Sequence, residues 1–215
     1  MSAVGRGRTR PVRRRPRARA PAGASESRRT EILAIAASIF AAKGYDGTTI
    51  REIADAVGVL PGSLYHHFRS KEEMLHDIVK PFLRHSIDVY REIARRGDSP
   101  TVTMRHLVHA GLVVSLREPA THSILLHQWD IVARSRKFSY VVRGWIETRQ
   151  LWLDVIRAGV RAGEFREGLD VRLTADLVLE QISSTVLWSR FRPGTPIAEV
   201  ARRHVDLLMG GLLRH

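Results

Sequence analysis

Residues 48–68 read Thr48-Thr49-Ile50-Arg51-Glu52-Ile53-Ala54-Asp55-Ala56-Val57-Gly58-Val59-Leu60-Pro61-Gly62-Ser63-Leu64-Tyr65-His66-His67-Phe68 and hold two short helical patterns joined by a tight glycine turn. The second pattern carries small, hydroxyl and aromatic side chains where an apolar stripe would be expected to dominate. This arrangement is typical of a helix-turn-helix whose second helix lies in the major groove of DNA. It therefore predicts a DNA-binding head.

Local signals set the limits of these two helices. Thr49 followed three residues later by Glu52 is a capping box, which predicts that the first helix begins there. The second helix is expected over residues 61–68, because proline is tolerated at the first helical position. Leu64 and Phe68 are spaced i and i+4, so they are expected to pack this helix against the rest of the head.

The surrounding sequence predicts helices throughout. Order is expected to begin near Ser27, and a long helix follows Ser70, with Pro81 expected to kink it. No alternating pattern typical of a strand is found. We therefore predict an all-α fold, with a three-helix head over residues 27–75 and a larger helical domain over residues 76–215. The helices expected in the larger domain span residues 101–117, 119–133, 136–162, 171–190 and 196–213.

The charge of the chain favours a polyanionic partner. The 215 residues carry a formal net charge of +13, and residues 1–24 hold eight arginines and no acidic residue. Residues 1–26 are predicted to be a disordered basic tail, which either adds contacts to DNA phosphates or is a dispensable extension. The chain has no cysteine, and no stretch resembles a signal peptide or a membrane span. We expect a soluble cytoplasmic protein that does not bind membranes.

The candidate DNA contacts fall into two groups. Hydroxyls, cations and helix ends hold phosphates, whereas base edges are read in the groove. Arg51 could pair with guanine or be a solvated charge, which the sequence leaves open. Leu60, Pro61 and Gly62 offer apolar contact with thymine methyl groups and close backbone approach. The candidate phosphate ligands are Thr49, Ser63, Tyr65, His66 and Lys71.

These residues resemble the TetR family of bacterial transcription regulators. The resemblance implies a homodimeric repressor of operator DNA, whose C-terminal helices hold a small-molecule inducer and form the dimer interface. It also implies DNA contacts at Thr49, Arg51, Pro61, Ser63, Tyr65, His66 and Lys71. Leu60 departs from the family pattern, because many members have a capping Ser or Thr there. The motifs that carry the resemblance are Phe40-Ala41-Ala42-Lys43-Gly44-Tyr45, residues 48–54, Gly58-Val59, residues 62–68 and Ser70-Lys71-Glu72-Glu73-Met74-Leu75.

The C-terminal half is similar to TetR-type regulators of steroid-ring degradation. That similarity implies an acyl-CoA intermediate as the effector. It depends on Phe138-Ser139-Tyr140, residues 149–155, Phe165-Arg166, Leu169-Asp170-Val171, Trp188 and Arg192-Pro193-Gly194, together with the Gly62-Ser63-Leu64 variant of the head and the Lys71-Glu72-Glu73-Met74 that follows it.

An effector cavity needs apolar walls and a few polar anchors. Tryptophan and phenylalanine could supply the walls or could equally be plain core. Arg143 and Arg149 could anchor an anionic group, and for Arg149 a surface ion pair is an equal alternative. The histidines lack the spacing of a metal site. The aromatic candidates are Trp129, Phe138, Trp145, Trp152 and Trp188.

The function that these features predict is a ligand-responsive repressor. The last two helices carry apolar faces that suit a dimer interface or packing inside one monomer, and the sequence does not separate the two. No catalytic motif is present, so an enzyme and a bound cofactor are not expected. The alternative is a non-specific architectural DNA-binding protein that uses the arginine-rich tail.

Overall fold

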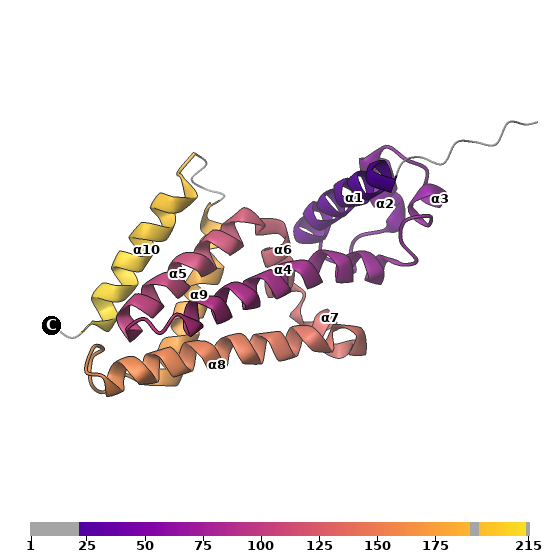
Figure 1. Cartoon of the computed structure of the whole chain (residues 1–215). Helices are drawn as coiled ribbons and strands as arrows, with labels where there is room; N and C mark the ends of the chain where they lie inside the picture. Colours follow the sequence, from indigo (N-terminus) through magenta and orange to yellow (C-terminus); the bar gives the residue numbers. More distant parts are fainter. Residues whose placement is uncertain (1–21, 190–193, 214–215) are drawn as a thin grey trace, which may run out of the picture.

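The computed structural model describes residues 22–189 and 194–213, and these form helices joined by short loops (Figure 1). One isolated β-bridge, between Phe165 and Leu213, is the sole extended pairing in those ranges. The all-α prediction is therefore confirmed. None of the helices in the described part of the chain is long and apolar enough to cross a membrane.

The head consists of three helices. They are α1 (Ala22–Lys43), α2 (Ile50–Val57) and α3 (Pro61–Leu64). The Thr49 side chain accepts a hydrogen bond from the Glu52 backbone N–H, and the Glu52 carboxylate accepts one from the Thr49 backbone N–H. The capping box is thus complete. Gly58 ends α2 with φ of 75°, a left-handed conformation that glycine adopts without strain.

The second helix of the motif is shorter than predicted. It ends at Leu64, and residues 65–67 form a turn instead of continuing to Phe68. The side chain of Leu60 gives the helix no capping hydrogen bond. A single turn without a cap and with Gly62 inside it has little intrinsic helical stability. The start of α1 also differs from the prediction, since residues 22–26 are helical; the rest of the predicted tail lies outside the described residues.

Helix α4 (Lys71–Arg95) leads from the head into the larger domain and lies beside α8 (Figure 1). Pro81 lies inside this helix and does not end it. Two of the predicted segments are divided. The segment 119–133 splits at Gln128, and the segment 136–162 begins with one turn of 3-10 helix. The elements after α4 are α5 (Pro100–Arg117), α6 (Pro119–His127), α7 (Trp129–Arg134), η1 (Arg136–Phe138), α8 (Ser139–Arg161), α9 (Val171–Ser189) and α10 (Ile197–Leu212).

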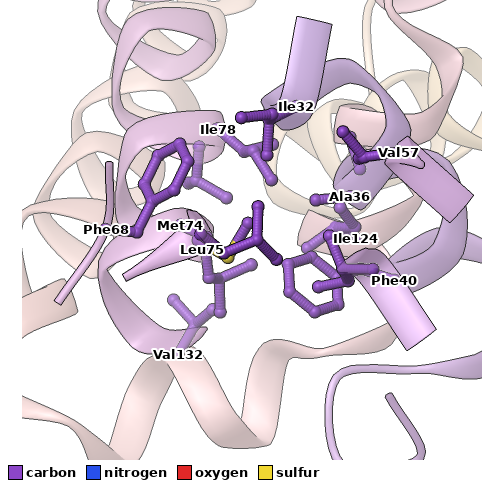
Figure 2. Packing of buried hydrophobic residues seen from close by; sticks show 14 of the residues in the cluster. Ile32, Ala36, Phe40, Val57, Phe68, Met74, Leu75, Ile78, Ile124 and Val132 are labelled. Atoms are coloured by element: carbon purple, nitrogen blue, oxygen red, sulfur yellow. The ribbon is translucent and has the colours of Figure 1, made fainter. Parts of the chain in front are cut away.

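The core of the head extends into the larger domain. Leu64 and Phe68 are buried in it, as their spacing predicts. Ile124 of α6 and Val132 of α7 pack into the same cluster, close to Phe40 and Leu75 in Figure 2. Burying these side chains together stabilises the head and fixes α6 and α7 against it. The hydrophobic core therefore crosses the boundary predicted after residue 75.

A second core holds the larger domain together. Helix α5 runs through it and packs against α4, α8, α9 and α10. Trp152 is fully buried there, with its ring edge-on to Tyr90 at 6.0 Å between centroids. Gly159 allows Phe165 to approach, because a Cβ at Gly159 would lie 2.2 Å from that ring. Two members of this core, Tyr90 and Ile182, also line the cavity described below.

Candidate DNA interface and effector cavity

Six of the nine predicted DNA contacts lie on one short segment of the head, residues 60–66, and the other three lie at the starts of α2 and α4. Tyr65 is 58% exposed and Leu60 is 77% exposed, although both are large and partly or wholly apolar. The Tyr65 and His66 side chains have no hydrogen-bond partner among the described residues. An apolar surface kept open in this way is typical of a binding site. Thr49, Arg51, Gly62 and His66 are exposed, and Pro61 and Ser63 are partly exposed.

The scaffold beneath this segment is held by short polar contacts. Glu52 accepts hydrogen bonds from the Thr49 backbone and from the Lys43 ammonium at 2.7 Å. These contacts lower the pKa of Glu52 to about 2. On the other side, Arg29 lies 4.6 Å above the Phe68 ring and donates a hydrogen bond to Asp77. Helices α1, α2 and α4 therefore hold the segment in a fixed orientation.

Lys71 has internal partners that the sequence did not reveal. Its ammonium donates to the backbone carbonyls of Tyr45 and Thr48, both at 2.7 Å, and lies 4.2 Å from the centre of the Tyr45 ring. These internal contacts explain why a lysine stands at the start of α4, without any contact to DNA. An ammonium has three donors, so one N–H is left for a phosphate.

A cavity of about 540 Å³ lies in the larger domain between α4, α6, α8 and α9. This volume is in the range of sites that hold drug-sized molecules. Phe82 and Leu125 form part of its apolar wall, and the partly exposed Trp129 and Trp145 line it with ring centres 5.9 Å apart. The cavity therefore offers the aromatic walls that the sequence predicts for an effector site.

His122 and Tyr90 are the two titratable side chains in the lining, and the sequence had pointed to neither as a ligand contact. The Nε2 atom of His122 is buried without a hydrogen-bond partner, and its ring lies edge-on to Phe82 at 6.1 Å. Burial lowers the pKa of His122 to about 4 and raises that of Tyr90 to about 12. Both groups are thus neutral at pH 7. The sequence carries no signal that would have marked a single histidine and a tyrosine at core spacing as ligand contacts.

The remaining predicted ligand residues lie elsewhere. Arg149 donates two hydrogen bonds to the Asp176 carboxylate, at 2.7 and 2.8 Å, so the ion-pair alternative describes it in this structure. Phe138 is buried in the core of the head, and Trp152 is buried in the second core. Arg143 lines a separate hollow between α8, the end of α4 and the start of α5. The side chain of Trp188 lies outside the described residues.

One hydrogen bond joins the cavity wall to the head. Gln128 stands at the break between α6 and α7 and directly precedes the cavity residue Trp129 in the sequence. Its side-chain oxygen accepts from the Tyr45 backbone N–H at 3.1 Å. Because Ile124 is also part of the head's core, a displacement of α6 reaches the head by two routes.

The apolar faces of α9 and α10 divide into two sets. Val178, Ile182 and Val200 are buried within the monomer. Leu177 and Leu207, by contrast, are at least 60% exposed and border the same groove between α9 and α10. The structure therefore assigns the first set to packing inside the chain and leaves the second uncovered.

The two halves of the chain match known sequence families. Residues 32–78 match the model for bacterial regulatory proteins of the tetR family, and residues 97–212 match the tetracyclin repressor-like C-terminal domain. The transcriptional repressor KstR2 of Rhodococcus jostii is 37% identical over 190 residues, which cover 86% of this chain and 91% of that protein.

Solved structures give the same result. The structure of the ketosteroid transcriptional regulator KstR2 of Mycobacterium tuberculosis has a TM-score of 0.82 and 34% identity, and the match covers 87% of this chain and 96% of that one. The regulator AibR, solved in complex with isovaleryl coenzyme A and operator DNA, shares the fold with a TM-score of 0.72 at 20% identity, over 86% of this chain and 98% of that one.

The exposed helix-turn-helix and the helical domain behind it define a DNA-binding transcriptional regulator. The protein belongs to the tetR family of bacterial regulatory proteins. Members of this family are regulators of transcription, so the absence of a catalytic motif from the sequence agrees with its class.

Proposed function

We propose that this protein is a homodimeric repressor that binds a palindromic operator and is released when a small molecule enters the cavity lined by Trp129 and Trp145. One observation carries the proposal. The same short helix, α6, contributes His122 and Leu125 to the cavity and Ile124 to the core of the DNA-binding head. A change on one side of α6 therefore changes the surroundings of the other.

On the DNA side, we assign phosphate contacts to Tyr65, His66, Ser63 and the free N–H of Lys71. For Ser63, Tyr65 and His66, the assignment is supported by side chains that make no hydrogen bond within the described residues, and Tyr65 and His66 are also exposed. Lys71 has two internal partners and is assigned only through its remaining N–H. Thr49 adds a hydroxyl at the start of α2. Base contacts are assigned to the exposed Arg51 and to the apolar tip formed by Leu60, Pro61 and Gly62.

On the effector side, the proposed ligand class is an acyl-CoA derived from catabolism of a ring compound. Similarity to KstR2, which is described as a ketosteroid regulator, supports a ring-bearing acyl group. The apolar wall of the cavity suits such a group, and the polar carrier would remain outside the cavity. A chain with these partners acts on DNA in the cytoplasm.

We assign the dimer interface to the uncovered face of α9 and α10. Leu173, Leu177 and Leu207 are exposed there, and burying them against a second copy would remove a large apolar surface from water. A two-fold dimer presents two heads to half-sites about 34–36 Å apart on successive major grooves. The effector would then favour an arrangement in which the two heads no longer match this spacing.

The deciding experiment measures binding of the full chain to the DNA upstream of its own gene and to a shuffled duplex of the same composition. A repressor binds its operator at least about 10³-fold more tightly than the shuffled duplex at physiological salt. Equal affinity for the two duplexes would support the architectural alternative. Release is tested by adding acyl-CoAs of increasing ring size, with free coenzyme A as the control.

A further inference from the structure

The segment Arg134-Ser135-Arg136-Lys137 joins α7 to η1, and three of its four residues are basic. Arg134, Arg136 and Lys137 are all exposed. Neither arginine forms a hydrogen bond or an ion pair within the described part of the chain. A guanidinium is always charged and has five N–H donors that match the oxygens of a phosphate. Two unpaired arginines separated by one residue therefore offer a binding site for an anion.

This segment belongs to the larger domain in the sequence, but it is attached to the head. Val132 before it and Phe138 after it are both buried in the hydrophobic core of the head. Between them, the Ser135 hydroxyl donates a hydrogen bond to the Glu72 carboxylate at 2.9 Å. The segment is thus held against the start of α4 by both of its flanks and by one of its own side chains.

The start of α4 also belongs to the proposed DNA interface. Glu72 directly follows Lys71, whose ammonium lies 2.7 Å from the carbonyl oxygens of Tyr45 and Thr48, beside the loop that leads into α2. The remaining N–H of Lys71 is assigned to a phosphate. Duplex DNA carries one negative charge for about every 1.7 Å of its axis. A duplex that meets Lys71 therefore presents further phosphates to the segment that Glu72 holds.

The acidic side chains next to the segment leave the charge of the two arginines uncompensated. Glu72 is occupied by Ser135 and by the ammonium of Lys137, which lies 3.8 Å from its other carboxylate oxygen. Asp130 lies one helical turn before Arg134, and the two form no ion pair among the residues that the structure describes. Lys137 thus balances Glu72, and the arginines remain free for an external partner.

We propose that Arg134 and Arg136 bind the phosphate backbone of DNA and form a second contact beside that of the helix-turn-helix. The proposal rests on the proposed function and adds a DNA contact made by the domain that holds the effector cavity. Phosphate contacts carry no sequence information, so this segment raises the affinity for DNA without selecting a sequence.

The test compares the full chain with the double variant Arg134→Gln/Arg136→Gln on the DNA upstream of its gene and on a shuffled duplex, over a range of salt concentrations. A homodimer loses two arginines from each protomer, and each phosphate contact contributes about 0.9 to the slope of log affinity against log salt. We expect the slope to decrease by about two to four. At physiological salt, the affinity for both duplexes should fall at least about fivefold.

Two further variants separate a direct contact from a loss of net charge. Arg161→Gln/Arg172→Gln removes the same charge from exposed positions at the end of α8 and the start of α9, at the far end of the larger domain from the head (Figure 1). Because salt screens distant charges, this variant should keep the wild-type slope and affinity. Arg134→Lys/Arg136→Lys should keep most of the slope, since lysine also binds phosphate as a point charge.

Ethylation interference locates the contact on the operator. With the wild type, ethylation of at least one phosphate in each half-site should block binding through the loss of a contact to these arginines. Ethylation of the same phosphate should no longer affect binding of the glutamine variant. The phosphates assigned to the helix-turn-helix should interfere in both proteins.

The inference is overturned by a wild-type slope in the glutamine variant, by an equal decrease in the Arg161 and Arg172 variant, or by an unchanged interference pattern. It is also overturned if the glutamine variant binds DNA normally but binds free coenzyme A more weakly, which would assign the arginines to the charged part of an effector. The proposed function fails separately, if the wild type binds upstream and shuffled DNA equally. In that case the salt slope on the shuffled duplex still tests the two arginines.

Discussion

The backbone N–H of Tyr45 donates a hydrogen bond to the side-chain oxygen of Gln128 at 3.1 Å, across 83 positions of the chain. Tyr45 belongs to the loop that leads into α2, and its ring lies beneath the Lys71 ammonium. Gln128 lies between α6 and α7, both of which contribute residues to the cavity wall. This contact therefore links the loop that supports the DNA-binding helices with the element that would meet an effector.

Replacing Gln128 with Ala should loosen this link and leave the fold intact. The Tyr45 amide would lose its partner, so its hydrogen exchange should become about fivefold faster, which corresponds to about 1 kcal/mol for one hydrogen bond. Amide exchange followed by NMR measures this directly. Gln150→Ala is the control, because Gln150 bonds to Asp154 on the exposed side of α8. Unchanged exchange at Tyr45 in Gln128→Ala would mean that the bond is not maintained in solution.

Tyr65→Phe should weaken DNA binding without changing sequence preference. The Tyr65 side chain is largely exposed and makes no internal hydrogen bond, so the change removes one phenol contact and little else. We expect a loss of about three- to tenfold on operator and shuffled DNA alike, measured by fluorescence anisotropy. Arg51→Ala provides the contrast, with a loss confined to the operator if Arg51 reads a base. A loss confined to the operator in Tyr65→Phe would reject the phosphate assignment.

His122 should make the stability of the protein depend on pH. Burial lowers its pKa from 6.5 to about 4 in the folded state, so the unfolded chain binds more protons between these two values. Stability therefore rises with pH through this window and is level above it. The contribution lost between pH 7 and pH 5 is about 2 kcal/mol. Urea titrations of the wild type and His122→Asn should differ in this slope, whereas His109→Asn, a change at an exposed position, should not alter it.

Leu177→Glu and Leu207→Glu should each break the proposed dimer. Both leucines are exposed in the monomer, and a buried unpaired carboxylate at the interface would be costly. Sedimentation equilibrium should show a dimer dissociation constant at least about thirtyfold larger. Val102→Glu, at an exposed apolar position on α5, is the matched control. If both variants stay dimeric at wild-type concentrations, a different face forms the interface.

Removing residues 1–21 should reduce non-specific DNA affinity more than operator preference. This segment carries eight arginines, and each phosphate contact contributes about 0.9 to the slope of log affinity against log salt. The slope should therefore decrease by up to about seven. A chain of full length with these arginines changed to Gln controls for length. An identical slope in all three proteins would show that the tail makes no contacts with DNA phosphates.

The class of fold and the DNA-facing segment could be predicted from local sequence, for a physical reason. A capping box at Thr49, a left-handed glycine at position 58 and an i, i+4 apolar pair at Leu64 and Phe68 act within one or two helical turns. Such interactions involve residues that are close together in the sequence, so they can be inferred without tertiary structure. The same holds for the all-α composition of the larger domain.

Tertiary structure alone decided which side chains meet. A predicted helix is interrupted at Gln128, where the sequence has no glycine or proline, and the Gln128 side chain bonds to a loop 83 positions away. Trp152 and Trp145 lie on one helix and look alike in sequence, yet one is in the core and the other lines the cavity. His122 has a lowered pKa because the surrounding helices bury it and His127 lies nearby. These outcomes depend on contacts between segments far apart in the chain, and periodicity carries no information about such contacts.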